Sequence, residues 1–219
     1  MAKKIVDAKL KWQSLLSTVK VDLNLGDRVF IDLITAYSTR QRYYHNLAHV
    51  EQVLEVIEKM RSHSRNFPAI QFAAWFHDII YDPKAKDNEE KSAAYAAKAL
   101  TSLGITSIID KVSELILITK SHQLTDNEDI DSQILLDADL SILGTSAPEY
   151  RIYANAIRQE YAWLCESEYR TGRIKVLEKF LQRKRIYYTE EMFANLELTA
   201  RQNIEEEIKF LSAVNDYTI

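Results

Sequence analysis

A histidine and an aspartate stand next to each other, as His77 and Asp78, in the otherwise apolar segment AAWFHDII at residues 73–80. A carboxylate placed among apolar side chains is destabilised by several kcal/mol, or its pKa rises, unless it has a partner. An imidazole nitrogen and a carboxylate oxygen together suit a borderline or hard divalent cation. The pair therefore predicts a bound metal ion, and the alternative is a dyad exposed at the end of a helix.

Two histidines upstream add ligand chemistry. His45 and His49 lie four residues apart in the segment YHNLAH (residues 44–49), so on a helix they would share one face. Asn46 is a residue type that caps helices, and a helix that begins after it would leave His45 outside and less constrained. A plain capping or core role is the alternative for each histidine.

Two aspartates downstream supply further carboxylates. Asp137 and Asp139 lie in the segment LDADL (residues 136–140) after a strongly apolar run, and on residue type alone either could be a ligand. Ligands collected from three segments, with positions left for water, would activate that water as a nucleophile and neutralise charge on a bound phosphate. The three segments together predict metal-assisted chemistry on a phosphate group.

The elements that must position these residues are helices. The chain has 219 residues, 47% of them hydrophobic, with only four glycines and three prolines, so it has few helix breakers and enough apolar residues for a large core. Apolar residues recur at helical spacing almost throughout, and strand-type turn signals are missing. We therefore predict one compact all-α domain over residues 1–219, with the metal-site core at about 42–144 and a C-terminal helical extension.

Local signals predict where some helices begin and end. Gly26 is expected to separate the first amphipathic helix from the second, so that the two helices form a hairpin. Pro68 is expected in the first turn of the helix that carries the His77-Asp78 pair, and Asp82-Pro83 is expected to end it. Neighbours on a helix point about 100° apart, which makes joint coordination by this pair awkward but feasible.

Composition also bears on partners and location. A net charge of −4 disfavours bulk binding of nucleic acid. No segment approaches ~18 uninterrupted apolar residues, and the charged N-terminus does not fit a signal peptide, so we expect a cytoplasmic protein without a membrane partner. The single cysteine, Cys165, is expected to be a partly buried thiol within a helix. His122 is expected at a helix end, where a cation suits the helix dipole, and a role in binding substrate phosphate is the competing interpretation.

The order of a histidine, a His-Asp pair and a distant aspartate resembles the HD superfamily of metal-dependent phosphohydrolases, and in particular a bacterial branch of predicted phosphohydrolases. The resemblance spans roughly residues 42–144 and implies a helical bundle. The segments that carry it are YHN at 44–46, FHDIIYDP at 76–83, DNEEKSA at 87–93 and LDADL at 136–140.

The resemblance also implies the roles of individual residues. It implies His49, His77, Asp78 and Asp139 as ligands of one divalent ion (Mn, Fe, Co, Ni, Mg or Zn), and it favours Asp139 over Asp137. Asp137 would then either cap a helix or hydrogen-bond a metal ligand without itself binding the metal. The HNxxH element is similar to that of cyclic-nucleotide phosphodiesterases, in which the first histidine, here His45, protonates the leaving group.

The resemblance implies a hydrolase that acts on a phosphate ester or anhydride of a small nucleotide-like metabolite. Asp82 would help to orient the attacking water. Tyr81-Asp82 stands where the (p)ppGpp hydrolases carry a Glu-Asp pair, which disfavours alarmone hydrolysis. The alternative function is a non-catalytic, metal- or nucleotide-binding regulatory protein that keeps the HD core.

Overall fold

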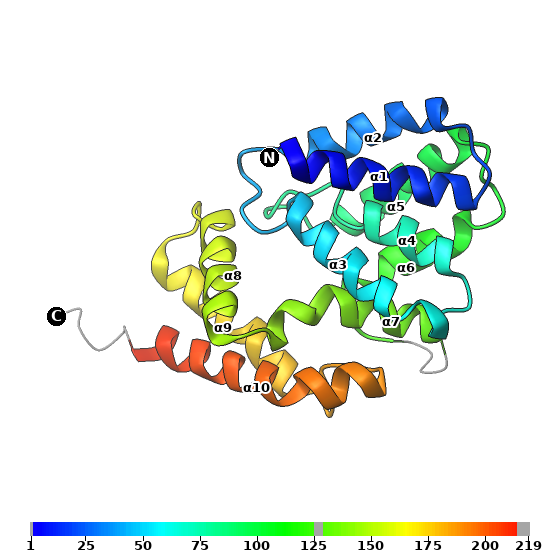
Figure 1. The fold of residues 1–219 in the computed structure, drawn as a ribbon. Helices are drawn as coiled ribbons and strands as arrows, with labels where there is room; N and C mark the ends of the chain where they lie inside the picture. Colours follow the sequence, from blue (N-terminus) through cyan, green and yellow to red (C-terminus); the bar gives the residue numbers. More distant parts are fainter. Residues whose placement is uncertain (1, 125–128, 214–219) are drawn as a thin grey trace. The chain divides into compact units, whose positions relative to one another are not determined.

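The computed structural model describes residues 2–124 and 129–213. All regular elements in these residues are helices and none is a strand, which confirms the all-α prediction (Figure 1). The elements are α1 (Ala2–Thr18), α2 (Leu23–Tyr37), α3 (Leu47–Lys59), the 3₁₀ helix η1 (Arg61–His63), α4 (Phe67–Phe76), α5 (Asn88–Ser102), α6 (Ile109–Ile118), α7 (Ile130–Asp139), the 3₁₀ helix η2 (Leu140–Gly144), α8 (Ala147–Glu160), α9 (Glu166–Leu181) and α10 (Glu190–Ala213).

The chain divides into two compact units, residues 1–138 and 139–219. The division falls between Ala138 and Asp139, the last two residues of α7. The predicted metal-site core therefore lies in the first unit as far as Ala138.

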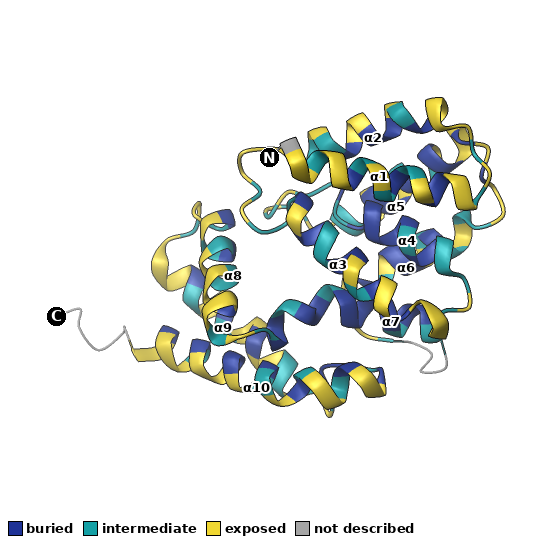
Figure 2. Ribbon diagram, viewed as in Figure 1, coloured by how far each residue is buried: buried dark blue, intermediate teal, exposed yellow. Residues whose placement is uncertain are grey.

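Helix α4 is the centre of the first unit, where α1, α3, α5 and α6 all pack against it. Its residues are apolar except for Gln71, and most of it is coloured as buried (Figure 2). The indole of Trp12 meets the rings of Phe72 and Trp75 edge to face, with centroids 5.8 and 5.7 Å apart. Pro68 lies in its first turn, as predicted. The packing fixes the position of α4, and with it the residues that follow Phe76.

Gly26 lies inside α2, and the prediction that it separates two helices is wrong. The break falls earlier, between the end of α1 at Thr18 and the start of α2 at Leu23. Gly26 is buried where α1 and α2 approach closely, since a Cβ there would come within 2.0 Å of Leu16 Cδ1. Its carbonyl also accepts a hydrogen bond from the indole of Trp12 at 3.1 Å. The glycine therefore allows close helix packing and does not end a helix.

Helix α7 is held by a buried carboxylate near its start. The Asp131 side chain accepts hydrogen bonds from the backbone N–H groups of Arg65 and Asn66, both at 2.8 Å, and from the hydroxyl of Ser64 at 3.0 Å. These donors lie just before α4. The carboxylate therefore fixes α7 against the α3–α4 connection.

In the second unit, η2 is bound to α10 and to the segment before it. The Tyr187 hydroxyl donates to the Leu140 carbonyl at 3.0 Å, and the Asn203 amide donates to the carbonyls of Leu143 and Thr145, both at 2.9 Å. Cys165 is exposed at the N-cap of α9. The prediction of a partly buried thiol within a helix is therefore wrong, because the helix begins one residue later.

Candidate metal centre

Helix α3 positions His49. The Asn46 side chain caps the helix by accepting a hydrogen bond from the backbone N–H of Ala48 at 2.9 Å, as its residue type predicts. The helix begins at Leu47, so His49 lies buried in the first turn while His45 lies outside the helix. Of the two alternatives for His45, the structure shows the less constrained one.

The His77-Asp78 pair lies just beyond α4, which ends at Phe76 with His77 as its C-cap. The prediction that the helix continues to Asp82-Pro83 is wrong. Side chains from distant parts of the chain form hydrogen bonds with the backbone after Phe76. Arg42 donates to the carbonyls of Asp78 and Ile79. The Ser92 hydroxyl accepts from the N–H of Ile80 and donates to its carbonyl. Because these groups are satisfied in this way, a turn forms where a helix would otherwise continue.

This turn brings three predicted ligands together. The Nε2 atoms of His49 and His77 are 3.1 Å apart, and Asp78 Oδ2 lies 3.2 Å from His77 Nε2 and 3.7 Å from His49 Nε2. Both imidazoles are buried, and the Asp78 side chain is 17% exposed. His77 keeps helical dihedral angles as the C-cap of α4, and the ligand atoms of the two neighbours nevertheless meet.

Asp139 joins the same group from the end of α7. One carboxylate oxygen of Asp139 and one nitrogen each of His49 and His77 lie within 4.8 Å of one another, and these three residues could hold a metal ion. Asp137 is fully buried two residues earlier in the helix. Residues two apart on a helix point about 200° apart, so the two carboxylates face different directions. Of the two aspartates of α7, Asp139 is the one that belongs to this group.

The geometry of the two imidazoles fits a shared cation. His77 Nδ1 lies 2.9 Å from the Ala74 carbonyl. A carbonyl oxygen only accepts, so Nδ1 carries the proton and Nε2 offers its lone pair to the group. Two nitrogens that each lie about 2.1 Å from one ion, at ligand angles of about 90° to 110°, are about 3.0 to 3.4 Å apart. The observed separation of 3.1 Å falls in this range.

The charge state of Asp78 also suits a ligand. Burial opposes ionisation of its carboxyl group, but the neighbouring imidazoles of His77, His45 and His49 outweigh burial and lower the pKa of this group well below its usual value. The carboxylate is therefore held ionised by protonated imidazoles, and a metal ion bound through their nitrogens would have to displace those protons.

His45 lies beside the group and not within it. Its ring stacks on Tyr81 with centroids 4.3 Å apart and an interplanar angle of 28°, and it is 5.8 Å from the ring of His49. Its backbone carbonyl accepts a hydrogen bond from Arg42 at 3.2 Å. Sequence reasoning missed Arg42, because an arginine in the polar segment STRQR at residues 38–42 looks like an ordinary surface cation.

The two remaining predicted residues, Asp82 and His122, are not among the three residues whose ligand atoms cluster. Asp82 is exposed, and its Oδ1 accepts a hydrogen bond from the backbone N–H of Lys84 at 2.9 Å. His122 follows the end of α6 with φ at +49°, and its N–H donates to the Ile118 carbonyl at 3.0 Å. The position of His122 at a helix end agrees with the prediction, and its role toward a substrate stays a prediction.

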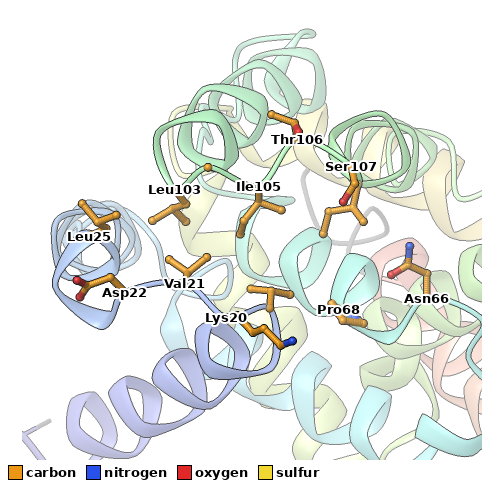
Figure 3. Close-up of a pocket in the computed structure, with 13 residues that line it drawn as sticks. Lys20, Val21, Asp22, Leu25, Asn66, Pro68, Leu103, Ile105, Thr106 and Ser107 are labelled. Atoms are coloured by element: carbon orange, nitrogen blue, oxygen red, sulfur yellow. The ribbon is translucent and has the colours of Figure 1, made fainter.

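A cavity of about 540 Å³ opens elsewhere in the first unit, between the α1–α2 connection, the start of α4 and the α5–α6 connection (Figure 3). None of the predicted site residues lines it. Two of its polar side chains, Asp22 and Asn66, serve as caps of α2 and α4. The cavity therefore does not share the chemistry of the candidate metal centre.

Comparison with known proteins leaves the family open. No protein-family model matches the chain, and a search of curated proteins finds no match. Among the described helices, none combines the length and the apolar character needed to cross a membrane.

Proposed function

We propose that this chain is a metal-dependent phosphohydrolase of the HD type, which acts on a phosphate ester or anhydride of a small nucleotide-like metabolite. The observation that carries this proposal is the convergence of His49, His77 and Asp139, from three separated segments, with ligand atoms within 4.8 Å of one another. Asp78 adds a carboxylate beside both histidines. Mixed histidine and carboxylate ligands that leave positions for water are typical of hydrolytic metal sites.

In the proposed mechanism, His49, His77, Asp78 and Asp139 would hold one divalent ion. When bound, such an ion lowers the pKa of water and neutralises charge on the phosphate. His45 protonates the leaving oxygen, and its stacking on Tyr81 keeps the imidazole beside the group without making it a ligand. Asp82 would help to orient the attacking water, and its Oδ1 already accepts a hydrogen bond from the Lys84 N–H.

The test begins with metal content. Protein purified without an affinity tag should carry about one divalent ion per chain by plasma mass spectrometry, whereas His77→Ala and Asp78→Ala should lose most of it. His63→Ala is the matched control, because His63 is exposed on η1. Full metal occupancy in both ligand variants would refute the proposed site.

Turnover is then tested with a set of phosphorylated metabolites in the presence of Mn²⁺, Co²⁺, Ni²⁺, Zn²⁺ or Mg²⁺. Hydrolysis that is lost in His77→Ala and kept in His63→Ala supports a phosphohydrolase. A chain that binds metal and a nucleotide but hydrolyses none of these compounds would instead be a binding protein with a regulatory role.

A further inference from the structure

The guanidinium of Arg42 binds both the loop that contains His45 and the turn that contains Asp78. Arg42 Nη1 donates to the His45 carbonyl at 3.2 Å and to the Asp78 carbonyl at 2.5 Å, and Nη2 donates to the Ile79 carbonyl at 2.8 Å. The first acceptor precedes α3 and the other two follow α4. Arg42 therefore connects the loop of the proposed acid with the turn of the proposed ligand.

Aromatic rings hold the guanidinium in this position. Its central carbon lies 5.1 Å from the ring centroid of Tyr37 and 5.6 Å from that of Tyr81, the same ring on which His45 stacks. Tyr37 is itself fixed by a hydrogen bond from its hydroxyl to the Trp75 carbonyl at 2.9 Å. A planar, preorganised fork between two rings can bind several carbonyls at defined angles, which a flexible ammonium cannot do.

The contacts of Arg42 bear on the direction of two side chains. The carbonyl carbon and the side chain of Asp78 are bonded to the same Cα. A hydrogen bond that fixes the carbonyl therefore also restricts the positions that Oδ2 can take. Without Arg42, the carbonyls of Asp78 and Ile79 would lose their partners, and the turn could relax toward a continued helix.

We propose that Arg42 is a positioning residue of the metal centre. It orients Asp78 toward His49 and His77, and it keeps His45 against Tyr81. The inference rests on the proposed function, because it takes the group to be a metal site and His45 to be its proton donor.

The experiment measures binding of Co²⁺ to the metal-free full chain by calorimetry and by the visible absorption of the bound ion. Arg42→Gln should weaken Co²⁺ affinity by about 10- to 100-fold, the usual effect of losing a group that orients a ligand. Its Co²⁺ absorption should also change in shape, because the Asp78 carboxylate is misdirected. On any substrate that the parent hydrolyses, kcat should fall more than KM changes, since Arg42 is not placed to touch the substrate.

Arg158→Gln is the matched control. Arg158 lies in α8, which supplies none of the ligands, and donates to the carbonyls of Tyr161 and Leu164 at 3.0 and 3.4 Å with its guanidinium over the ring of Tyr169. It therefore shares carbonyl and ring contacts with Arg42, adds an ion pair with Glu166 at 3.1 Å, and contacts no proposed ligand through any of these groups. Its replacement should leave Co²⁺ affinity and absorption unchanged.

The outcomes separate this inference from the proposed function. A parent chain that binds no Co²⁺ or other divalent ion refutes both. If the parent binds Co²⁺ and Arg42→Gln has the parent's affinity and absorption, or if Arg158→Gln loses as much, only the role of Arg42 is overturned. Should Arg42→Gln fail to fold, Arg42→Lys decides: it keeps the charge but not the fork, so we expect a loss of several-fold, and an affinity equal to the parent's overturns the role.

Discussion

At the scale of residues, the candidate centre depends on which side chains face one another. The ligand atoms of the neighbours His77 and Asp78 lie 3.2 Å apart at the end of α4, whereas Asp137 and Asp139 diverge because they share a helix. The same kind of side chain therefore has a different role according to the backbone that carries it.

The two aspartates of α7 give a direct comparison. Asp139→Asn should lose both metal and activity, because one ligand of the group is removed. Asp137→Asn should keep measurable metal, with an affinity reduced by no more than about 10- to 100-fold. Calorimetric titration with Mn²⁺ or Co²⁺ measures both, and the opposite ranking would make Asp137 the ligand.

His45 separates proton transfer from metal binding. His45→Gln should keep the parent's metal content, because its ring lies beside the group and not in it. Its kcat should fall by about 10²- to 10⁴-fold, the usual range for one general acid or base. The loss should shrink on an activated aryl phosphodiester, whose leaving group needs little protonation. Full activity of His45→Gln on every substrate of the parent would make His122 the next candidate.

At the scale of elements, buried polar contacts decide where helices end and what they face. Arg42 and Ser92 end α4 at Phe76, and Asp131 holds α7 against the residues before α4. Two elements of the candidate centre are thus positioned by side chains that are not ligands.

The Asp131 contact predicts a measurable loss of stability. Asp131→Ala removes the acceptor of two backbone N–H groups and one hydroxyl, so the free energy of unfolding should fall by about 2 to 4 kcal/mol. Urea unfolding followed by circular dichroism measures it. Asp27→Ala is the control: Asp27 pairs with Lys9 at the surface, and its loss should cost less than about 1 kcal/mol. Equal effects of the two changes would contradict the role given to Asp131.

At the scale of the whole molecule, the proposed ion acts on folding as well as on chemistry. Its ligands come from α3, from the turn after α4 and from the last residue of α7, and only the folded chain brings these segments together. A ligand that binds only the folded state stabilises it by mass action.

Adding Co²⁺ to the metal-free chain at about 100 times its Kd should therefore raise the free energy of unfolding by about 2.7 kcal/mol. The increase should vanish in His77→Ala and persist in His63→Ala. Scanning calorimetry with and without the ion measures this, and an equal increase in His77→Ala would show that the ion binds elsewhere. The same scan tests the single domain expected from the composition. A single domain over residues 1–219 should unfold in one thermal transition.

The sequence by itself determined the all-α class, the cap at Asn46, the position of Pro68 in the first turn of α4, and the residue types of the candidate centre. These features follow from the conformational preferences of single residues and from the periodicity of apolar residues, neither of which depends on contacts with distant residues.

Only the tertiary structure decided that α4 ends at Phe76, that Gly26 lies within a helix, and that Asp139 rather than Asp137 belongs to the group with His49 and His77. The end of α4 depends on Arg42, which is 36 residues from Asp78 in the chain, and the place of Gly26 depends on its contact with Leu16. Such contacts join residues far apart in sequence, and local patterns carry no information about them.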